Sequence, residues 1–202
     1  MTIRKISTIL LFAFSFLILS CGDDKNSDDI KTEEVKTDDK VLSDIIIDEE
    51  LGISYQVPLQ WELMSSELTE RYVARLDSEK FDGNFIVYQP KAFYFNSSIS
   101  GLLRVGGIDK SKESEEKELS IQNYITLYQK FNSVQNIKQK KIQTDNLIVT
   151  QLIIEKSNLL SFKNIFVNKN KKIIQFDFSL QQKDYFNNKH AIEISLASIK
   201  NL

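Results

Sequence analysis

The sequence predicts an α+β domain built on a central antiparallel sheet, preceded by an export signal and an acidic linker. Residues 6–19 are almost all apolar and lead to the only cysteine of the chain. The next stretch is acidic and lacks aromatic residues. From about residue 45, short runs of β-forming residues joined by turn residues are interspersed with a few helical patterns. This order favours α+β over a doubly wound parallel sheet.

The first 20 residues predict a lipoprotein signal peptide. A cationic start with Arg4 and Lys5 precedes the apolar run Ile6–Leu19. These 14 residues would span roughly 21 Å as a helix, which is short of a hydrocarbon core of about 30 Å. Ile18–Cys21 resembles the lipobox of bacterial lipoproteins, in which the signal is cleaved before a lipidated cysteine. The resemblance implies that Cys21 is acylated and becomes the new N-terminus.

Two other interpretations of Cys21 stay open. The apolar run could be an uncleaved signal-anchor, or the protein could be secreted with an incidental cysteine. A single cysteine excludes an internal disulfide and every metal or redox motif that needs a cysteine pair. One acyl chain binds a membrane marginally, at about 0.8 kcal/mol per buried methylene. Lipoproteins of the resembling type carry three chains, which would make attachment effectively permanent.

The segment after Cys21 predicts a flexible tether. Residues 22–50 hold 12 acidic and 4 basic residues and no aromatic residue. Such a composition buries too little apolar surface to offset the entropy of ordering. We therefore expect residues 21–42 to form an acidic tether and residues 43–202 to form the globular domain.

The expected location is the bacterial cell envelope, with the lipid anchor in the outer membrane. Ser27–Asp29 resembles the acidic signals that send some Bacteroidetes lipoproteins to the cell surface. The alternative interpretation of this run is an ordinary solvated linker. Surface exposure therefore stays one of two hypotheses.

The C-terminal part of the chain is basic. Residues 130–202 contain 12 basic and 5 acidic residues, with lysines gathered at Lys138–Lys141 and Lys169–Lys172. Lysines in such places commonly protect a sheet edge or remain solvated. Export also argues against a nucleic-acid partner, so none is expected.

The first half of the domain predicts three strands and a helix. Ile53–Val57 is a short strand, and Ser66–Leu76 has apolar residues at helical spacing. Asn84–Phe95 is rich in β-forming residues and is interrupted by Pro90, which predicts a bulge or an edge there. Gly101–Ile108 is a further strand.

The second half predicts a helix followed by a run of hairpins. Ser120 is a candidate cap for a helix over Ile121–Asn132, after a charged loop at Lys110–Glu118. Turn residues at Thr144–Asn146 and Asn168–Asn170 separate β-rich runs. Four candidate strands follow the helix: Val134–Ile142, Leu147–Glu155, Leu160–Val167 and Lys172–Gln181.

Alternation in the last of these strands predicts one buried and one solvent-facing side. The apolar residues at 174, 176, 178 and 180 would face the core, with Phe176 at its centre. Gln175, Asp177 and Ser179 would then face water. Asp184 is expected to cap a final helix whose buried stripe contains Ile192, Leu196 and Ile199.

The opening of the domain resembles a known family. The run "LGISYQVPLQW", Leu51–Trp61, is similar to the start of PsbP/DcrB-like domains. The mid-chain helix, the strand meander and a last helix ending at Ser198–Lys200 also match, over roughly residues 45–202. The resemblance implies an α/β/α sandwich, a central antiparallel sheet with helices on both faces. Members of this family serve unlike roles, so fold does not decide function.

Residues with catalytic or binding chemistry are sparse. His190 is the only histidine and no Gly-x-Ser-x-Gly motif accompanies it, so a surface histidine is expected. Trp61, Tyr55 and Phe85 could line a ligand groove, but aromatic residues at strand positions favour a core. The acidic run Glu113–Glu118 favours a solvated loop over a cation site. We therefore expect no catalytic residue, no cofactor and no metal ligand, and a protein that is not an enzyme.

Three function hypotheses follow. The first is a lipid-anchored, non-catalytic domain that binds or helps assemble an envelope protein partner. The second is a small-molecule or lipid carrier with a pocket between sheet and helices, and the third is an envelope hydrolase. An exposed aromatic patch would favour the first, an apolar cavity the second, and a buried carboxylate pair the third.

Overall fold

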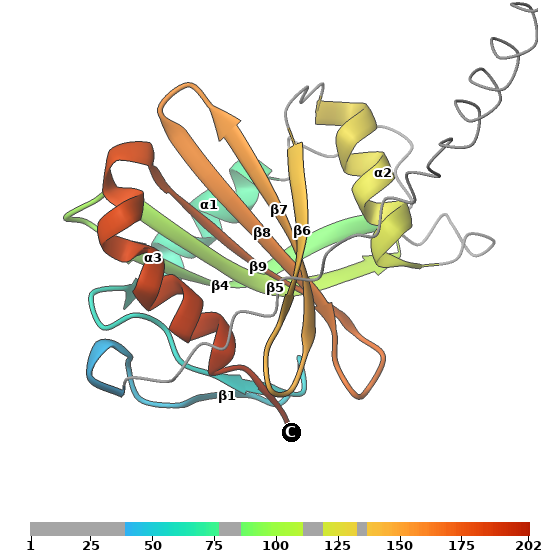
Figure 1. The fold of residues 1–202 in the computed structure, drawn as a ribbon, viewed down its shortest axis with the longest axis horizontal. Coiled ribbons are helices and arrows are strands. Elements are labelled where there is room, and N and C mark those ends of the chain that lie inside the picture. Colours follow the sequence, from blue (N-terminus) through green and yellow to red (C-terminus); the bar gives the residue numbers. More distant parts are fainter. Residues whose placement is uncertain (1–38, 77–85, 111–118, 133–136) are drawn as a thin grey trace, which may run out of the picture.

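The protein is a seven-stranded antiparallel sheet with a smaller three-stranded sheet and helices packed against it (Figure 1). The structure is a computed structural model that describes residues 39–76, 86–110, 119–132 and 137–202. The predicted α+β class is confirmed. The strands of the large sheet, in spatial order, are β3 (Glu62–Leu63), β4 (Ile86–Asn96), β5 (Gly101–Lys110), β9 (Ile173–Gln181), β8 (Leu159–Val167), β7 (Ile148–Lys156) and β6 (Ile137–Gln143).

Hairpins explain most of this order. Strands β6 to β9 form a meander whose neighbours in sequence are neighbours in space. The predicted turn residues close it, because the Thr144 hydroxyl accepts a hydrogen bond from the Leu147 amide at 3.1 Å. In the next turn but one, the Asn168 side chain accepts from the Lys172 amide at 2.9 Å. The β4–β5 hairpin then joins the meander through β5 and β9.

The small sheet consists of β1 (Ile46–Asp48), β2 (Ile53–Tyr55) and β10 (Lys200–Asn201), with β2 in the middle. A short 3-10 turn, η1 (Asp39–Val41), precedes it. Leu42 is buried and forms an isolated bridge with Pro58. The described chain is thus already packed against the domain at Leu42.

One face of the large sheet, here called the α3 face, carries the main core. The small sheet and α3 (Gln182–Ala197) cover it. The Phe176 ring meets Tyr55 edge-on at 5.1 Å, and Phe178 meets Trp61 at 5.6 Å. Ile192 and Leu196 of α3 complete the cluster, as predicted. Ile199 is also buried there, but the prediction that the last helix extends to Ser198–Lys200 is wrong: the helix ends at Ala197, and Lys200 begins β10 because it pairs with β2.

The opposite face, here called the α1–α2 face, is covered by the other two helices. On α1 (Ser66–Leu76), the Tyr72 ring lies 6.1 Å from Phe93 of β4. On α2 (Ile121–Asn132), Tyr124 and Ile125 belong to a second core cluster. Figure 1 shows α1 behind the sheet and α3 in front of it. Helices therefore lie on both faces, as predicted.

The predicted caps have opposite outcomes. The Ser120 hydroxyl accepts a hydrogen bond from the Asn123 amide at 3.1 Å, so this residue caps α2 as expected. The prediction that Asp184 caps the last helix is wrong. That helix begins at Gln182, directly after β9, and Asp184 lies in its first turn. No loop separates the strand from the helix, and no side chain caps it. The first backbone amide of the helix, that of Gln182, donates to the Asn158 carbonyl at 2.8 Å.

A bulge interrupts β4 where Pro90 predicted one, between Pro90 and Ala92. It brings the β4 backbone against Gly106 of β5. A Cβ atom on Gly106 would lie 2.1 Å from the Gln89 carbonyl oxygen. Glycine is required here by this close approach.

The prediction that Asp177 faces water is wrong. The apolar side of β9 is buried as expected, but Gln175 and Asp177 on its other side are also fully buried. The reason is the covering of the α1–α2 face by two helices. Alternation correctly separated the two faces, although it could not show that both are covered.

Candidate functional site: an exposed aromatic ring beside an amide-lined hollow

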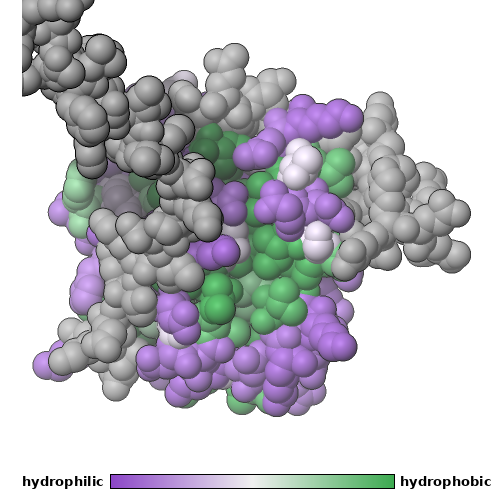
Figure 2. Space-filling view, turned by 45° about the vertical axis from the view of Figure 1, so that its right-hand side comes forward, coloured by the Kyte–Doolittle hydropathy of each residue, from purple (hydrophilic) through white to green (hydrophobic). Residues whose placement is uncertain are grey.

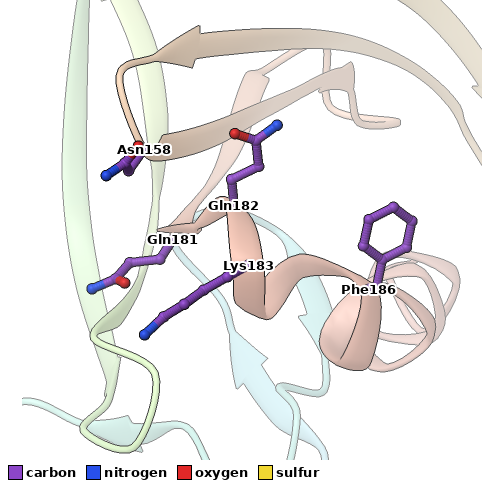
Figure 3. A pocket seen from close by; sticks show the side chains of 5 residues that line it. All are labelled: Asn158, Gln181, Gln182, Lys183 and Phe186. Carbon is purple, nitrogen blue, oxygen red and sulfur yellow. The ribbon is translucent and has the colours of Figure 1, made fainter.

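The start of α3 borders a hollow of about 520 Å³ at the surface. Its lining residues come from the β7–β8 turn and the β9–α3 junction: Asn158, Gln181, Gln182, Lys183 and Phe186 (Figure 3). Gln181 keeps an extended backbone, and the helix starts at the next residue. Because the Gln182 amide is bonded to the Asn158 carbonyl, the turn and the helix are held together at this point.

The hollow offers hydrogen bonds of both kinds. Three side-chain amides line it, and each can donate and accept. Lys183 adds a cationic donor. Figure 3 shows the Phe186 ring on one side of the hollow, with Asn158 and Gln181 on the other. The lining therefore combines the apolar stems of these side chains with several hydrogen-bonding groups, and one large apolar side chain stands at the rim.

Phe186 is the most exposed large hydrophobic residue among those described, at 83%. Its neighbour Tyr185 points into the protein and stacks on Phe162 at 4.8 Å. Tyr185 precedes Ile192 by seven residues and so continues the buried stripe of α3, which leaves Phe186 outside it. Single exposed apolar residues are common. What distinguishes Phe186 is its near-complete exposure beside a hollow with hydrogen-bonding groups.

A buried ion cluster lies elsewhere, on the α1–α2 face. The Asp177 carboxylate accepts hydrogen bonds from Lys163 at 2.7 Å and from the Ser161 hydroxyl at 2.9 Å, and also from Arg104. The Lys163 ammonium lies 4.9 Å from the centre of the Tyr128 ring. Asp177 of β9 lies between Arg104 of β5 and Lys163 of β8, and the Cα atoms of both cations pair with it in register across the sheet.

The electrostatics of this cluster favour the ionised form of Asp177. Burial alone would raise the pKa of Asp177, but the charges of Arg104 and Lys163 outweigh it and hold the pKa below its usual value. Burial raises the pKa of Tyr124 and of Tyr88 well above the ordinary value. A general acid or base works best with a pKa near the operating pH. The cluster is therefore suited to holding strands together rather than to proton transfer.

Gln175 lies beside this cluster and is fully buried. Its amide oxygen and nitrogen make no hydrogen bond of ordinary geometry in the described part of the chain, but the Tyr124 hydroxyl interacts with this side chain, and that contact opposes the rise in the pKa of Tyr124. The Tyr124 side chain lies next to it, and the Tyr88 hydroxyl is 3.5 Å from its backbone carbonyl. A buried polar group without a partner costs about 1–3 kcal/mol, so Gln175 calls for an explanation.

The residues named from the sequence are placed as follows. Cys21 and the tether up to residue 38 lie outside the described residues, as do Phe85 and Glu113–Glu118. Tyr55 and Trp61 belong to the core of the α3 face, as expected. His190 is exposed on α3, also as expected.

The described ranges contain no group of three or more His, Cys, Asp or Glu residues placed to hold a metal ion. Within these ranges Asp177 is the buried acidic residue, and its partners are cations instead of a second carboxylate. None of the helices in these ranges is long and apolar enough to cross a bilayer.

Sequence reasoning missed the hollow altogether. Asn158, Gln181 and Gln182 belong to no sequence motif. Only the fold, at the junction of β9 and α3, brings them together. A signal for Phe186 did exist in the heptad spacing of α3. Extending the stripe back from Ile192 reaches Tyr185 and leaves the next ring facing solvent.

Comparisons with known proteins add little about function. No family model matches this chain, and no curated protein matches it. Among solved structures, it is similar to the solution structure of cyanobacterial PsbP (CyanoP) from Synechocystis sp. PCC 6803. The TM-score is 0.48 at 11% sequence identity, covering 80% of this chain and 93% of that chain. A similarity of this size supports no conclusion about the activity or the partners of this chain.

Proposed function

We propose that this protein is a lipid-anchored lipoprotein of the bacterial cell envelope whose domain binds a protein partner without catalysing a reaction. The observation that supports partner binding is the Phe186 ring, 83% exposed beside the amide-lined hollow. The anchor is proposed at Cys21, because this residue follows Ser20 and the short apolar run.

The chemistry around Phe186 suits a protein surface. Aromatic residues that enter a pocket of the partner carry much of the energy of protein interfaces, and polar groups surround them. Burying a phenylalanine side chain is worth about 1.5–3 kcal/mol. Asn158, Gln181 and Gln182 can bond to backbone or side-chain groups around such an anchor.

The test is photo-crosslinking in intact cells of the source organism. A photoreactive phenylalanine analogue replaces Phe186, and a matched chain carries it at Gln122, an exposed position on α2. We expect one discrete protein adduct from position 186 that mass spectrometry identifies, and none of that mass from position 122.

Phe186→Ser is the companion variant. It should abolish co-purification of the identified protein, while its thermal unfolding matches the unchanged chain because the ring makes little contact with the core. Equal adducts from both positions, or co-purification that survives Phe186→Ser, would contradict the proposal.

The carrier hypothesis has one observation in its favour. The Gln175 amide is buried between the sheet and α2, and with the Tyr124 hydroxyl beside it at least one of its two polar atoms still needs a hydrogen bond, which a small polar ligand would supply. Native mass spectrometry of the purified chain distinguishes this candidate. A bound small molecule that is lost in Gln175→Leu would favour the carrier, because this variant keeps the size of the side chain and removes both polar atoms.

A further inference from the structure

The outer edge of β6 has no strand partner over its whole length in the described part of the protein. β6 (Ile137–Gln143) pairs with β7 along its whole length and ends the large sheet on that side. The opposite end of the sheet is β3, which has two residues. An edge strand presents unpaired backbone N–H and C=O groups that can pair with another chain.

The side chains along this edge are strongly cationic. Lys138, Lys140 and Lys141 are all exposed, and β6 contains no acidic residue. Lys138 forms an ion pair with Glu155 of β7 at 3.1 Å, and both side chains are exposed to water. Such a surface pair is weak. Among the described residues, Lys140 and Lys141 form no ion pair.

The alternation of β6 sets a charge pattern on each face. Lys138, Lys140 and Ile142 pair with residues 153, 151 and 149 of β7 and so lie on the α3 face. Lys141 lies on the α1–α2 face. Ile137 and Ile142, at the two ends of the strand, are half-buried. Figure 2, which brings the right-hand side of Figure 1 forward, shows a hydrophobic area bordered by hydrophilic side chains on this side of the molecule.

From this pattern we infer that the β6 edge binds an acidic, extended segment of a partner protein as an added antiparallel strand. Backbone hydrogen bonds would provide the pairing, and acidic side chains opposite the three lysines would set the register. Apolar side chains would lie opposite Ile137 and Ile142. This surface is separate from the hollow at Phe186, so the inference does not depend on the proposed function.

The sheet geometry specifies a test peptide. Read antiparallel to Ile137–Gln143, the complementary sequence is TVEETEV, with glutamates opposite Lys141, Lys140 and Lys138. The probe is this peptide, acetylated, amidated and fluorescently labelled, and the protein is the full chain in detergent micelles. Two control peptides are TVKKTKV, with reversed charge, and TVEPTEV, in which proline prevents regular strand pairing. We expect saturable anisotropy with the first peptide alone.

Matched charge reversals locate the binding. Lys140→Glu with Lys141→Glu should weaken binding about tenfold, because two attractive cross-strand pairs become repulsive. Lys169→Glu with Lys171→Glu makes the same change of net charge in the β8–β9 turn and should leave binding unchanged. Circular dichroism establishes that both variants are folded. If both double variants weakened binding equally, the effect would come from the net charge of the protein and not from the β6 edge, and the inference would be overturned.

Two further outcomes would also overturn it. Equal binding of the proline peptide would exclude strand addition. The tether of this chain is itself acidic, so its own residues could occupy the edge. If the probe binds only after Glu33→Gln with Glu34→Gln, the occupant is this chain and the inferred partner segment is wrong. Phe186→Ser should not change probe binding, which keeps this result independent of the proposed function.

Discussion

Phe176 and Asp177 are neighbours in β9, and each lies at the centre of a different face of the sheet. Phe176 touches Tyr55 and Phe166 in the core of the α3 face. Asp177 accepts hydrogen bonds from two cations on the α1–α2 face. β9 therefore contributes buried residues to both faces of the sheet. Phe176 is fully buried in an apolar core, and Asp177 is fully buried in an ion cluster.

Two substitutions in β9 should be equally severe. Phe176→Ala should cost about 3–5 kcal/mol from lost transfer and the cavity. Asp177→Ala should also cost about 3–5 kcal/mol, because it removes the buried carboxylate to which Lys163 and Arg104 both bond. Urea unfolding of residues 22–202 measures both. Glu155→Ala, in an exposed pair, is the control and should cost less than about 0.5 kcal/mol. A cost below about 1 kcal/mol for Asp177→Ala would refute the buried cluster.

The same carboxylate should make stability sensitive to acid. Its pKa is lowered in the folded protein, so its contribution is complete above the unfolded value of about 4. The contribution is lost as the pH falls through the lower, folded pKa. Asp177→Asn lacks this charge, so the difference in unfolding free energy between the two chains should shrink below about pH 4. Urea midpoints at neutral pH and at several acidic values measure it. A constant difference would show that the charge is not responsible.

At the scale of elements, the bulge in β4 and the glycines of β5 form one unit. The bulge pushes the Gln89–Pro90 backbone toward β5, and Gly106 is the residue that faces it. Gly107, the next residue, has no heavy atom nearer than 3.8 Å to its would-be Cβ. A methyl group would therefore fit at Gly107 but not at Gly106, although the two residues are neighbours in one strand.

This difference can be measured with one methyl group. Gly106→Ala should destabilise the domain by about 1–3 kcal/mol or more, because the new Cβ would overlap backbone that cannot rotate away. Gly107→Ala should change stability by less than about 1 kcal/mol in either direction. Thermal unfolding of the two variants gives the comparison. Similar melting temperatures would mean that the bulge relaxes freely.

Elements with a strong local signal were predictable from the sequence. The alternation of β9, the cap of α2 and the apolar stripe of α3 are all properties of consecutive residues. β1, β3 and β10 were not predicted, because strands of two or three residues are stabilised by their partners more than by their own sequence. The burial of Asp177 and Gln175 depends on which helices cover the second face, and the hollow beside Phe186 depends on the sharp β9–α3 junction.

At the scale of the whole molecule, the anchor can be tested apart from the fold. We predict that Cys21 is the acylated N-terminus of the mature protein. Cys21→Ala should abolish incorporation of radiolabelled palmitate and should move the protein from the membrane to the soluble fraction. Ser27→Ala, in the tether, is the control and should keep both. Unchanged labelling in Cys21→Ala would refute lipidation.

The small sheet has a consequence for the order in which the protein can assemble. The Gln56 amide donates to the Ser198 hydroxyl across 142 positions of sequence, and β10 pairs with β2. The small sheet therefore cannot finish covering Tyr55 and Phe176 until Ser198 has left the ribosome. Contacts between such distant positions slow folding because a large loop must close first. During that interval the chain stays without its finished core, which is the state that the proposed export through a membrane channel requires.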